Sequence, residues 1–137
     1  MCYNACGALG CIADGLFSIG SDARRQEVVC AGGLACIITA MQDHSESETV
    51  RESASSALGN IACGSNACKQ AVVDAGGLVS IVDAISAHGV QDRMLCPSAC
   101  WALTTIAAGS DALHQAVIDA YKRRGCSIPL RDIFAYR

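Results

Sequence analysis

The sequence repeats one short motif three times at a nearly constant spacing. A Gly-Ser-Asp-Ala or Gly-Ser-Asn-Ala motif begins at residues 20, 64 and 109, at intervals of 44 and 45 residues. Each copy is followed at the same offset by a glutamine and then by Val-Val or Val-Ile. A period in the forties that is carried by helical sequence is typical of a stacked α-solenoid. We therefore predict an all-α fold whose function depends on binding along a surface.

The motif also predicts where helices end and begin. A glycine after a helix can adopt the left-handed conformation that closes the last carbonyls, and a neighbouring serine can cap the next helix. Gly64-Ser65 is therefore expected to join two helices with almost no loop. The second of these is a short helix that is expected to end at Gly76-Gly77. The apolar face predicted for this short helix consists of Ala67, Ala71, Val72 and Ala75.

A second helix and a longer third helix are predicted in each repeat. The polar loop 44–48 separates them, and within it Ser45 and Glu48 have the spacing of a capping box. Pro97 lies inside the later copy of the third helix, which therefore begins near Pro97 or kinks there. The residues predicted to face inward from the third helices are Val50, Ala54, Ala57, Leu58, Ile61 and Ala62, then Leu95, Ala99, Ala102, Leu103, Ile106 and Ala107.

One string recurs in the predicted third helices. It reads ASSALGNIA at residues 54–62 and ACWALTTIA at 99–107, with a rougher copy, ACGALGCIA, at 5–13. A unit of two short helices and one longer helix that contains this string resembles the armadillo repeat. The resemblance covers about residues 5–120 and implies a right-handed α-solenoid. HEAT repeats are the nearest alternative, but they usually lack a separate short first helix.

The repeats divide a single armadillo-like solenoid, residues 1–137, into four parts. We expect a third helix of a partial repeat at 1–19 and a partial, irregular repeat at 109–137, because residues 121–124 stand where the Gly-Gly turn is expected. The two full repeats are predicted at 20–63 and 64–108.

The resemblance implies a peptide groove lined by third helices. In the importin-α kind of armadillo protein, a Trp and an Asn four residues later recur, the Asn fixing the peptide backbone and the Trp flanking basic side chains. That pair is split here, since Asn60 has Ser56 before it and Trp101 has Thr105 after it. The alternative is that Asn60 only bonds at a helix end and Trp101 only fills space between helices. The predicted groove residues are Asn60, Ser56, Ser53, Trp101, Thr105 and Ser98.

Charge and cysteine content restrict the possible partners and the compartment. Residues 1–120 carry five Lys/Arg against twelve Asp/Glu, so no nucleic-acid partner is expected. The basic residues at 122–131 are interpreted as a solvated helix end or a linker. Every apolar stretch is interrupted by a charge before it could span a membrane. Ten cysteines within helical patterns and no visible leader indicate unpaired thiols in a cytoplasmic protein, with the nucleus possible.

No catalytic, cofactor or metal site is predicted. The chain has no glycine-rich phosphate loop, nucleophile elbow or His-Glu-x-x-His motif, and its i,i+4 cysteine pairs (Cys2/Cys6 and Cys96/Cys100) lack two further zinc ligands. We therefore expect a non-catalytic adaptor or scaffold that binds a protein or peptide. The alternatives are a truncated or degenerate repeat protein that mainly self-associates and, with less support, a nuclear-transport adaptor.

Self-association is expected because the repeat frame is cut at both ends. Terminal repeats of a solenoid normally carry a polar outer face, whereas apolar side chains here would lack a covering helix. Their exposure would forfeit about 1.5–3 kcal/mol each. The predicted contact residues of a homo-oligomer are Leu9, Ile12, Leu16, Phe17, Ile128, Leu130, Ile133 and Phe134.

Overall fold

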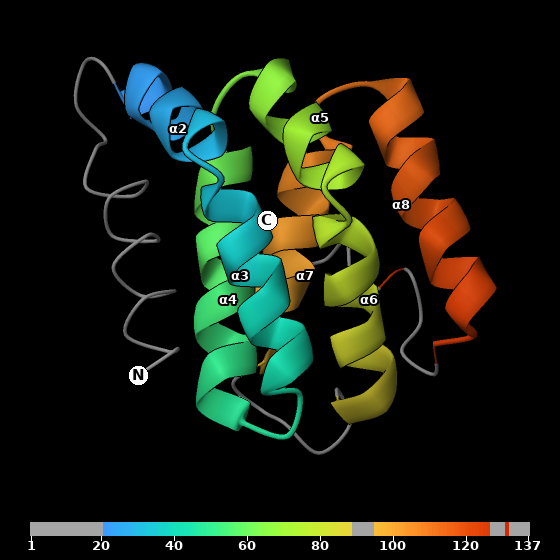
Figure 1. Ribbon diagram of the computed structural model, residues 1–137. Coiled ribbons are helices and arrows are strands. Elements are labelled where there is room, and N and C mark those ends of the chain that lie inside the picture. The colour runs from blue at the N-terminus through green and yellow to red at the C-terminus, as the bar shows by residue number, and fades with distance from the viewer. Residues whose placement is uncertain (1–20, 89–94, 127–130, 132–137) are drawn as a thin grey trace.

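The computed structural model describes residues 21–88, 95–126 and 131, and these residues form α-helices without any strand (Figure 1). The helices are short, between 9 and 15 residues, and are joined by tight turns. Their bounds are α2 Ser21–Cys30, α3 Gly33–Asp43, α4 Glu48–Ala62, α5 Asn66–Asp74, α6 Gly77–His88, α7 Leu95–Ala107 and α8 Asp111–Arg124. The fold is the predicted all-α solenoid.

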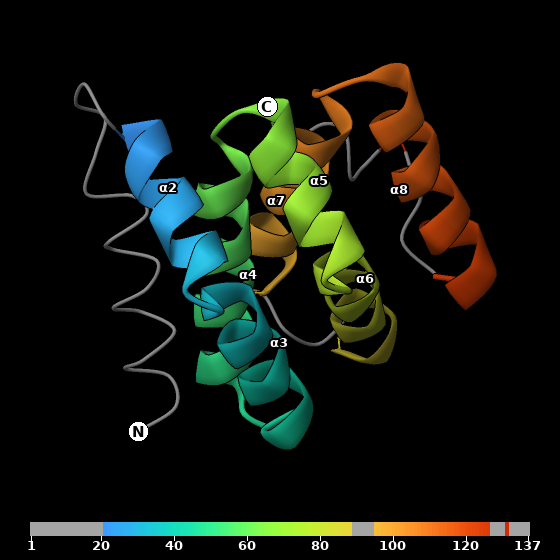
Figure 2. The ribbon, with the colours of Figure 1, turned by 45° about the horizontal axis from the view of Figure 1, so that its top comes forward.

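Equivalent helices of successive repeats stack beside one another. The first helices α2, α5 and α8 follow one another across the top of Figure 1, and the second helices α3 and α6 lie in front of the third helices α4 and α7. The turned view in Figure 2 keeps this order. The most extensive helix–helix contact joins α4 to α7, so the third helices form the continuous spine of the described structure.

The Gly-Gly turns need both of their glycines, for two different reasons. The first glycine of each turn is left-handed, with φ of 83° at Gly32 and 90° at Gly76, a conformation in which a Cβ is unfavourable. The second begins the next helix against the previous one, since a Cβ on Gly77 would lie 2.8 Å from Cγ1 of Val72. Gly33 is equally crowded. The repeated turn therefore fixes both the direction of the chain and the close approach of two helices.

The predicted left-handed conformation of Gly64 is wrong. Positive φ occurs among the described glycines only in the Gly-Gly turns and at Gly125. The third helices instead end with a tightened last turn, in which the N–H of Gly64 donates to the carbonyl of Ile61 at 3.2 Å. At Gly109 a Cβ would lie 2.5 Å from Cδ of Lys69, so the space there depends on where this flexible side chain lies.

Serine capping is confirmed, although one cap was placed two residues too early. Ser65 and Ser110 accept hydrogen bonds from backbone N–H groups at the start of α5 and α8, at 3.4 and 3.2 Å. The cap of α4 is Ser47, not the predicted Ser45. The carbonyl of Ser45 instead accepts from the buried Arg51 side chain at 2.6 Å, which holds that residue in the loop.

The predicted inward faces of the third helices are confirmed for every described side chain; the side chain of Leu95 lies outside the described residues. The helix α7 begins at Leu95, so Pro97 falls in the first turn, where it breaks no helical hydrogen bond. The face predicted for α5 is wrong in part. Cys68 and Val72 are buried, whereas Ala67 and Ala75 are exposed, because the buried face is centred on the larger side chains.

The final described helix is longer than predicted. The helix α8 continues through the basic residues to Arg124 and ends at Gly125, which has a φ of 60°. Tyr121 is buried in its last turn, and Arg124 pairs with Asp83 of α6 at 2.9 Å. Basic side chains at a helix C-terminus also complement its dipole. The segment that breaks the repeat pattern in the sequence therefore extends a first helix.

None of six described cysteines forms a disulfide bond, and two of them, Cys68 and Cys100, are buried; the other four are Cys30, Cys36, Cys63 and Cys126. Burial raises the pKa of the Cys126 thiol, and its Sγ lies 3.8 Å from the carbonyl of Val82. None of the described helices is by itself long and apolar enough to cross a membrane. The helices α5 and α6 pass on length and composition only when taken together, across a bend of 64°.

Ser55 offers a test of the repeat core. Its side chain is fully buried, its Oγ has no hydrogen-bond partner, and the equivalent position in α7 holds the buried Cys100. We expect Ser55→Ala to raise the free energy of unfolding by about 1 kcal/mol, because an unsatisfied buried hydroxyl is removed. Urea denaturation measures the change. The capping variant Ser65→Ala is the matched control and should lose about 1 kcal/mol; a loss of that size from Ser55→Ala would contradict the expectation.

Candidate functional site

The six groove residues predicted from the sequence are all partly exposed and lie on adjacent helices. Ser53, Ser56 and Asn60 belong to α4, whereas Ser98, Trp101 and Thr105 belong to α7. Residues three and four apart lie on the same face of a helix. Together with the partly exposed Glu52, we call these seven residues the third-helix surface.

A carboxylate and two hydroxyls join the two helices at one end of this surface. Oγ of Ser56 lies 3.2 Å from Oγ of Ser98, and these hydroxyls lie 3.4 and 3.3 Å from the same Oε1 oxygen of Glu52. Each hydroxyl has one proton, so two of these three contacts can be hydrogen bonds at one time. Sequence comparison between repeats missed Glu52, although its position one turn before Ser56 was a usable signal.

Trp101 packs against α4 and also stays partly exposed. The six-membered ring of its indole lies on Gly59, where a Cβ would be 2.3 Å from Cζ3. A side chain at position 59 would therefore collide with this ring. Trp101 therefore does pack between two helices, which the sequence analysis gave as the alternative to a binding role. The role of Trp101 in binding stays a prediction.

Asn60 and Thr105 differ in what their polar groups contact. The backbone carbonyl of Asn60 accepts a hydrogen bond from Nε of the buried Arg25 at 2.8 Å, which links α4 to α2. The hydroxyl of Thr105 donates to the carbonyl of Trp101 at 2.8 Å. A threonine that donates within its own helix has no second proton to offer a ligand. Thr105 is therefore less able than an asparagine to donate a hydrogen bond to a peptide backbone.

The exposed charges on the third helices have one sign. In α4 the exposed or partly exposed ionisable side chains are Glu48 and Glu52, and α7 contains no Asp, Glu, Lys or Arg. The one basic residue of α4, Arg51, is buried and its guanidinium reaches the carbonyl of Ser45. The third-helix surface is therefore acidic over its described length.

Comparison with known proteins finds solved structures but no sequence family. No protein-family model matches the chain, and no curated protein sequence does. A designed armadillo repeat protein matches at 26% identity with a TM-score of 0.77, covering 98% of this chain and 54% of its own. Another, in complex with the peptide (KR)4, matches at 29% identity with a TM-score of 0.71, covering 82% and 43%. The chain is built of armadillo repeats.

A third match is an engineered protein at 30% identity and a TM-score of 0.73, covering 86% of this chain and 44% of its own. The armadillo chain thus spans about half of the length of the structures that it matches. These comparisons and the helix arrangement agree on the repeat type that the sequence predicted.

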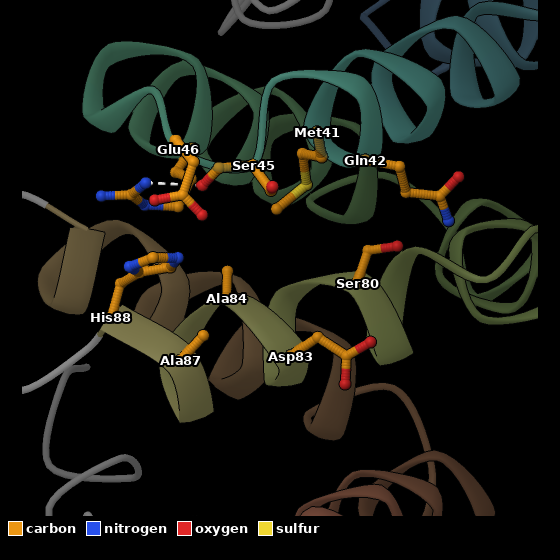
Figure 3. Close-up of a pocket in the computed structure, with 10 residues that line it drawn as sticks. Met41, Gln42, Ser45, Glu46, Ser80, Asp83, Ala84, Ala87 and His88 are labelled. Carbon is orange, nitrogen blue, oxygen red and sulfur yellow. Dashed lines mark hydrogen bonds between the residues drawn. The ribbon is translucent and has the colours of Figure 1, made fainter.

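A cavity of about 350 Å³ lies outside the third-helix surface of the armadillo repeats, between α3 with its following loop and α6 (Figure 3). Met41 and Ala84 line its apolar part, and His88 faces Glu46 across one end. The sequence analysis did not predict this cavity, because its lining comes from three separate segments: α3 with its following loop, Arg51 of α4, and α6. These residues occupy different positions in the two repeats. Across residues 21–88, 95–126 and 131, no three His, Cys, Asp or Glu side chains gather as metal ligands.

Proposed function

We propose that this armadillo chain is a non-catalytic protein-interaction module that binds an extended peptide along the third-helix surface. The observation that carries the proposal is the line of partly exposed polar and aromatic side chains across α4 and α7, which are packed directly against each other. The peptide complex of a designed armadillo repeat protein of similar structure supports it.

The chemistry of the surface suits an extended backbone. An asparagine amide such as that of Asn60 can donate to and accept from a peptide group, and the indole of Trp101 has a flat face that can bind an aliphatic or cationic side chain. Packed helices lie about 8–10 Å apart, and an extended chain advances about 3.3–3.6 Å per residue. A peptide that crosses from α4 to α7 would therefore advance by two to three residues between the two helices.

Trp101 tests the proposal most directly. Peptides are selected from a random library on the intact chain, and their affinity is then measured by calorimetry for Trp101→Ala and Asn60→Ala. We expect Trp101→Ala to weaken binding by about tenfold or more, because buried aromatic anchors dominate interfaces. Val79→Ala is the control, since Val79 is 41% exposed on the second helix α6. A strong fall in melting temperature with intact binding would make Trp101 a core residue and contradict the proposal.

Self-association remains the alternative proposal. The residues expected to mediate it lie outside the described residues: Leu9, Ile12, Leu16, Phe17, Ile128, Leu130, Ile133 and Phe134. Sedimentation velocity over a wide concentration range, with and without a selected peptide, separates the two functions. If the chain dimerises and still binds the peptide, both activities are supported. If the peptide dissociates the dimer, the dimer contact lies on the third-helix surface. The nuclear-transport alternative has less support, because the Trp-Asn pairs are split.

A further inference from the structure

The cavity between the second helices α3 and α6 has the size of a small-molecule site. Its volume is about 350 Å³, and ligand sites usually measure about 300–1,000 Å³. An apolar cavity of about 150 Å³ is enough to hold benzene, so this cavity has room for an aromatic ring with a short side chain. None of its lining residues belongs to the third-helix surface.

One serine presents a polar group inside the cavity. Ser80 is only 9% exposed, and its side chain points into the space between α3 and α6 (Figure 3). Its hydroxyl makes no hydrogen bond within residues 21–88, 95–126 and 131. A buried polar group without a partner costs free energy. The cavity therefore favours a ligand that forms a hydrogen bond with this hydroxyl.

Three residues of α6 divide the cavity into a polar, an apolar and a second polar part. Ser80, Ala84 and His88 follow one another at intervals of four residues, so they lie along one face of the helix. At a rise of about 1.5 Å per residue, the first and the last are about 12 Å apart. The buried Met41 of α3 joins Ala84 in the apolar part. The cavity therefore fits a molecule that has an apolar body and a polar group at each end.

The end of the cavity at His88 favours a positive charge. The exposed Glu46 faces His88 there, and neither side chain makes a hydrogen bond or ion pair within the part of the chain that the structure describes. The arginine of the lining, Arg51, is buried and donates to a backbone carbonyl. The second acid of the lining, Asp83, pairs with Arg124. An ammonium group would therefore be attracted to Glu46, and an anion would be repelled.

We propose that this cavity binds a small amphipathic amine. Its ammonium group lies at Glu46, its apolar body lies on Met41 and Ala84, and a hydrogen-bonding group at its other end reaches Ser80. The proposal is independent of peptide binding, because the cavity and the third-helix surface share no residue. The ligand would contact the second helices of two successive repeats in the folded chain, and its binding would therefore raise the melting temperature.

Four matched aromatic compounds test the parts of this proposal on the intact chain. Tyramine has an ammonium group, a ring and a hydroxyl. Phenethylamine lacks the hydroxyl, p-ethylphenol lacks the ammonium group, and p-hydroxyphenylpropionate carries a carboxylate instead. Each is titrated into isotope-labelled protein, and the shifts of the backbone amide signals give both the affinity and the site. We expect tyramine to shift amides of α3 and α6, and to bind about fivefold more tightly than phenethylamine or p-ethylphenol and about tenfold more tightly than the carboxylate.

Two substitutions assign the two ends of the ligand. Glu46→Gln keeps the shape of the side chain and should weaken tyramine binding by about fivefold, while p-ethylphenol binding stays unchanged. Glu48→Gln is the matched control, because Glu48 is exposed but does not line the cavity, and it should change the affinity by less than about twofold. Ser80→Ala should remove the advantage of tyramine over phenethylamine. Circular dichroism melts confirm that the variants fold.

Specific results would overturn the proposal. If tyramine at millimolar concentration shifts no amide of α3 or α6, the cavity does not bind this class of ligand. Equal affinities for tyramine and the carboxylate, or equal losses from Glu46→Gln and Glu48→Gln, would refute the charge preference and with it the amine. If Ser80→Ala leaves the ratio of the tyramine and phenethylamine affinities unchanged, the assignment of the second polar end fails.

Discussion

Leu58→Ala is expected to lower the free energy of unfolding by about 2–5 kcal/mol, the largest effect of any single substitution considered for this chain. Leu58 is fully buried in α4, and its Cδ2 lies 3.5 Å from the position that a Cβ on Gly77 would occupy. The side chain thus packs the third helix of one repeat against the second helix of the next. A cavity at this contact would weaken the coupling on which stacked repeats depend.

Urea denaturation followed by circular dichroism measures this effect. Natural domains have a free energy of unfolding of about 5–15 kcal/mol, so the Leu58→Ala protein should unfold at a much lower denaturant concentration or be unfolded at 25 °C. Val79→Ala is the exposed apolar control and should change stability by less than about 0.5 kcal/mol. A loss below 1 kcal/mol for Leu58→Ala would mean that this side chain contributes little to the packing between the two repeats.

The repeat type could be predicted from the sequence because each repeat carries the same signals for its turns and its buried faces. The Gly-Gly turns at Gly32 and Gly76 have equivalent conformations, and the inward faces of α4 and α7 follow the same spacing. One error arose where a choice depended on the neighbouring repeat. The burial of Cys68 instead of Ala67 in α5, for example, is linked to the amide of Gln26 in α2, which lies 3.3 Å from its Sγ.

The candidate site could be predicted only in part from the sequence. Repeat alignment located Asn60 and Trp101, because each occupies one half of a recognisable pair. It did not reveal Glu52, since the contacts of this carboxylate with Ser98 join residues that are 46 positions apart. It also gave Gly59 no role, since the crowding at that position comes from the tryptophan ring of the next repeat.

Gly59→Ala is the second large effect that we expect, with a net loss of up to about 2 kcal/mol in the free energy of unfolding. A Cβ on Gly59 would lie 2.3 Å from Cζ3 of Trp101 and 3.2 Å from Cβ of Ala102. The helix preference for alanine over glycine would contribute about 1 kcal/mol in the opposite direction, so the collision must exceed that gain for the variant to be destabilised. Overpacking of a close contact typically costs about 1–3 kcal/mol.

A double-mutant cycle with Trp101→Ala identifies the ring as the cause. Once the indole is removed, the new Cβ at position 59 has room, so Gly59→Ala should become neutral or stabilising in the Trp101→Ala background, with a coupling energy of about 1–3 kcal/mol. Urea denaturation of the four proteins gives the cycle. If Gly59→Ala stabilises the wild-type background by the helix-preference term alone, the ring can move aside at no cost. In that case Trp101 would be held by α7 alone, and a peptide ligand could reposition it without loosening the contact between the repeats.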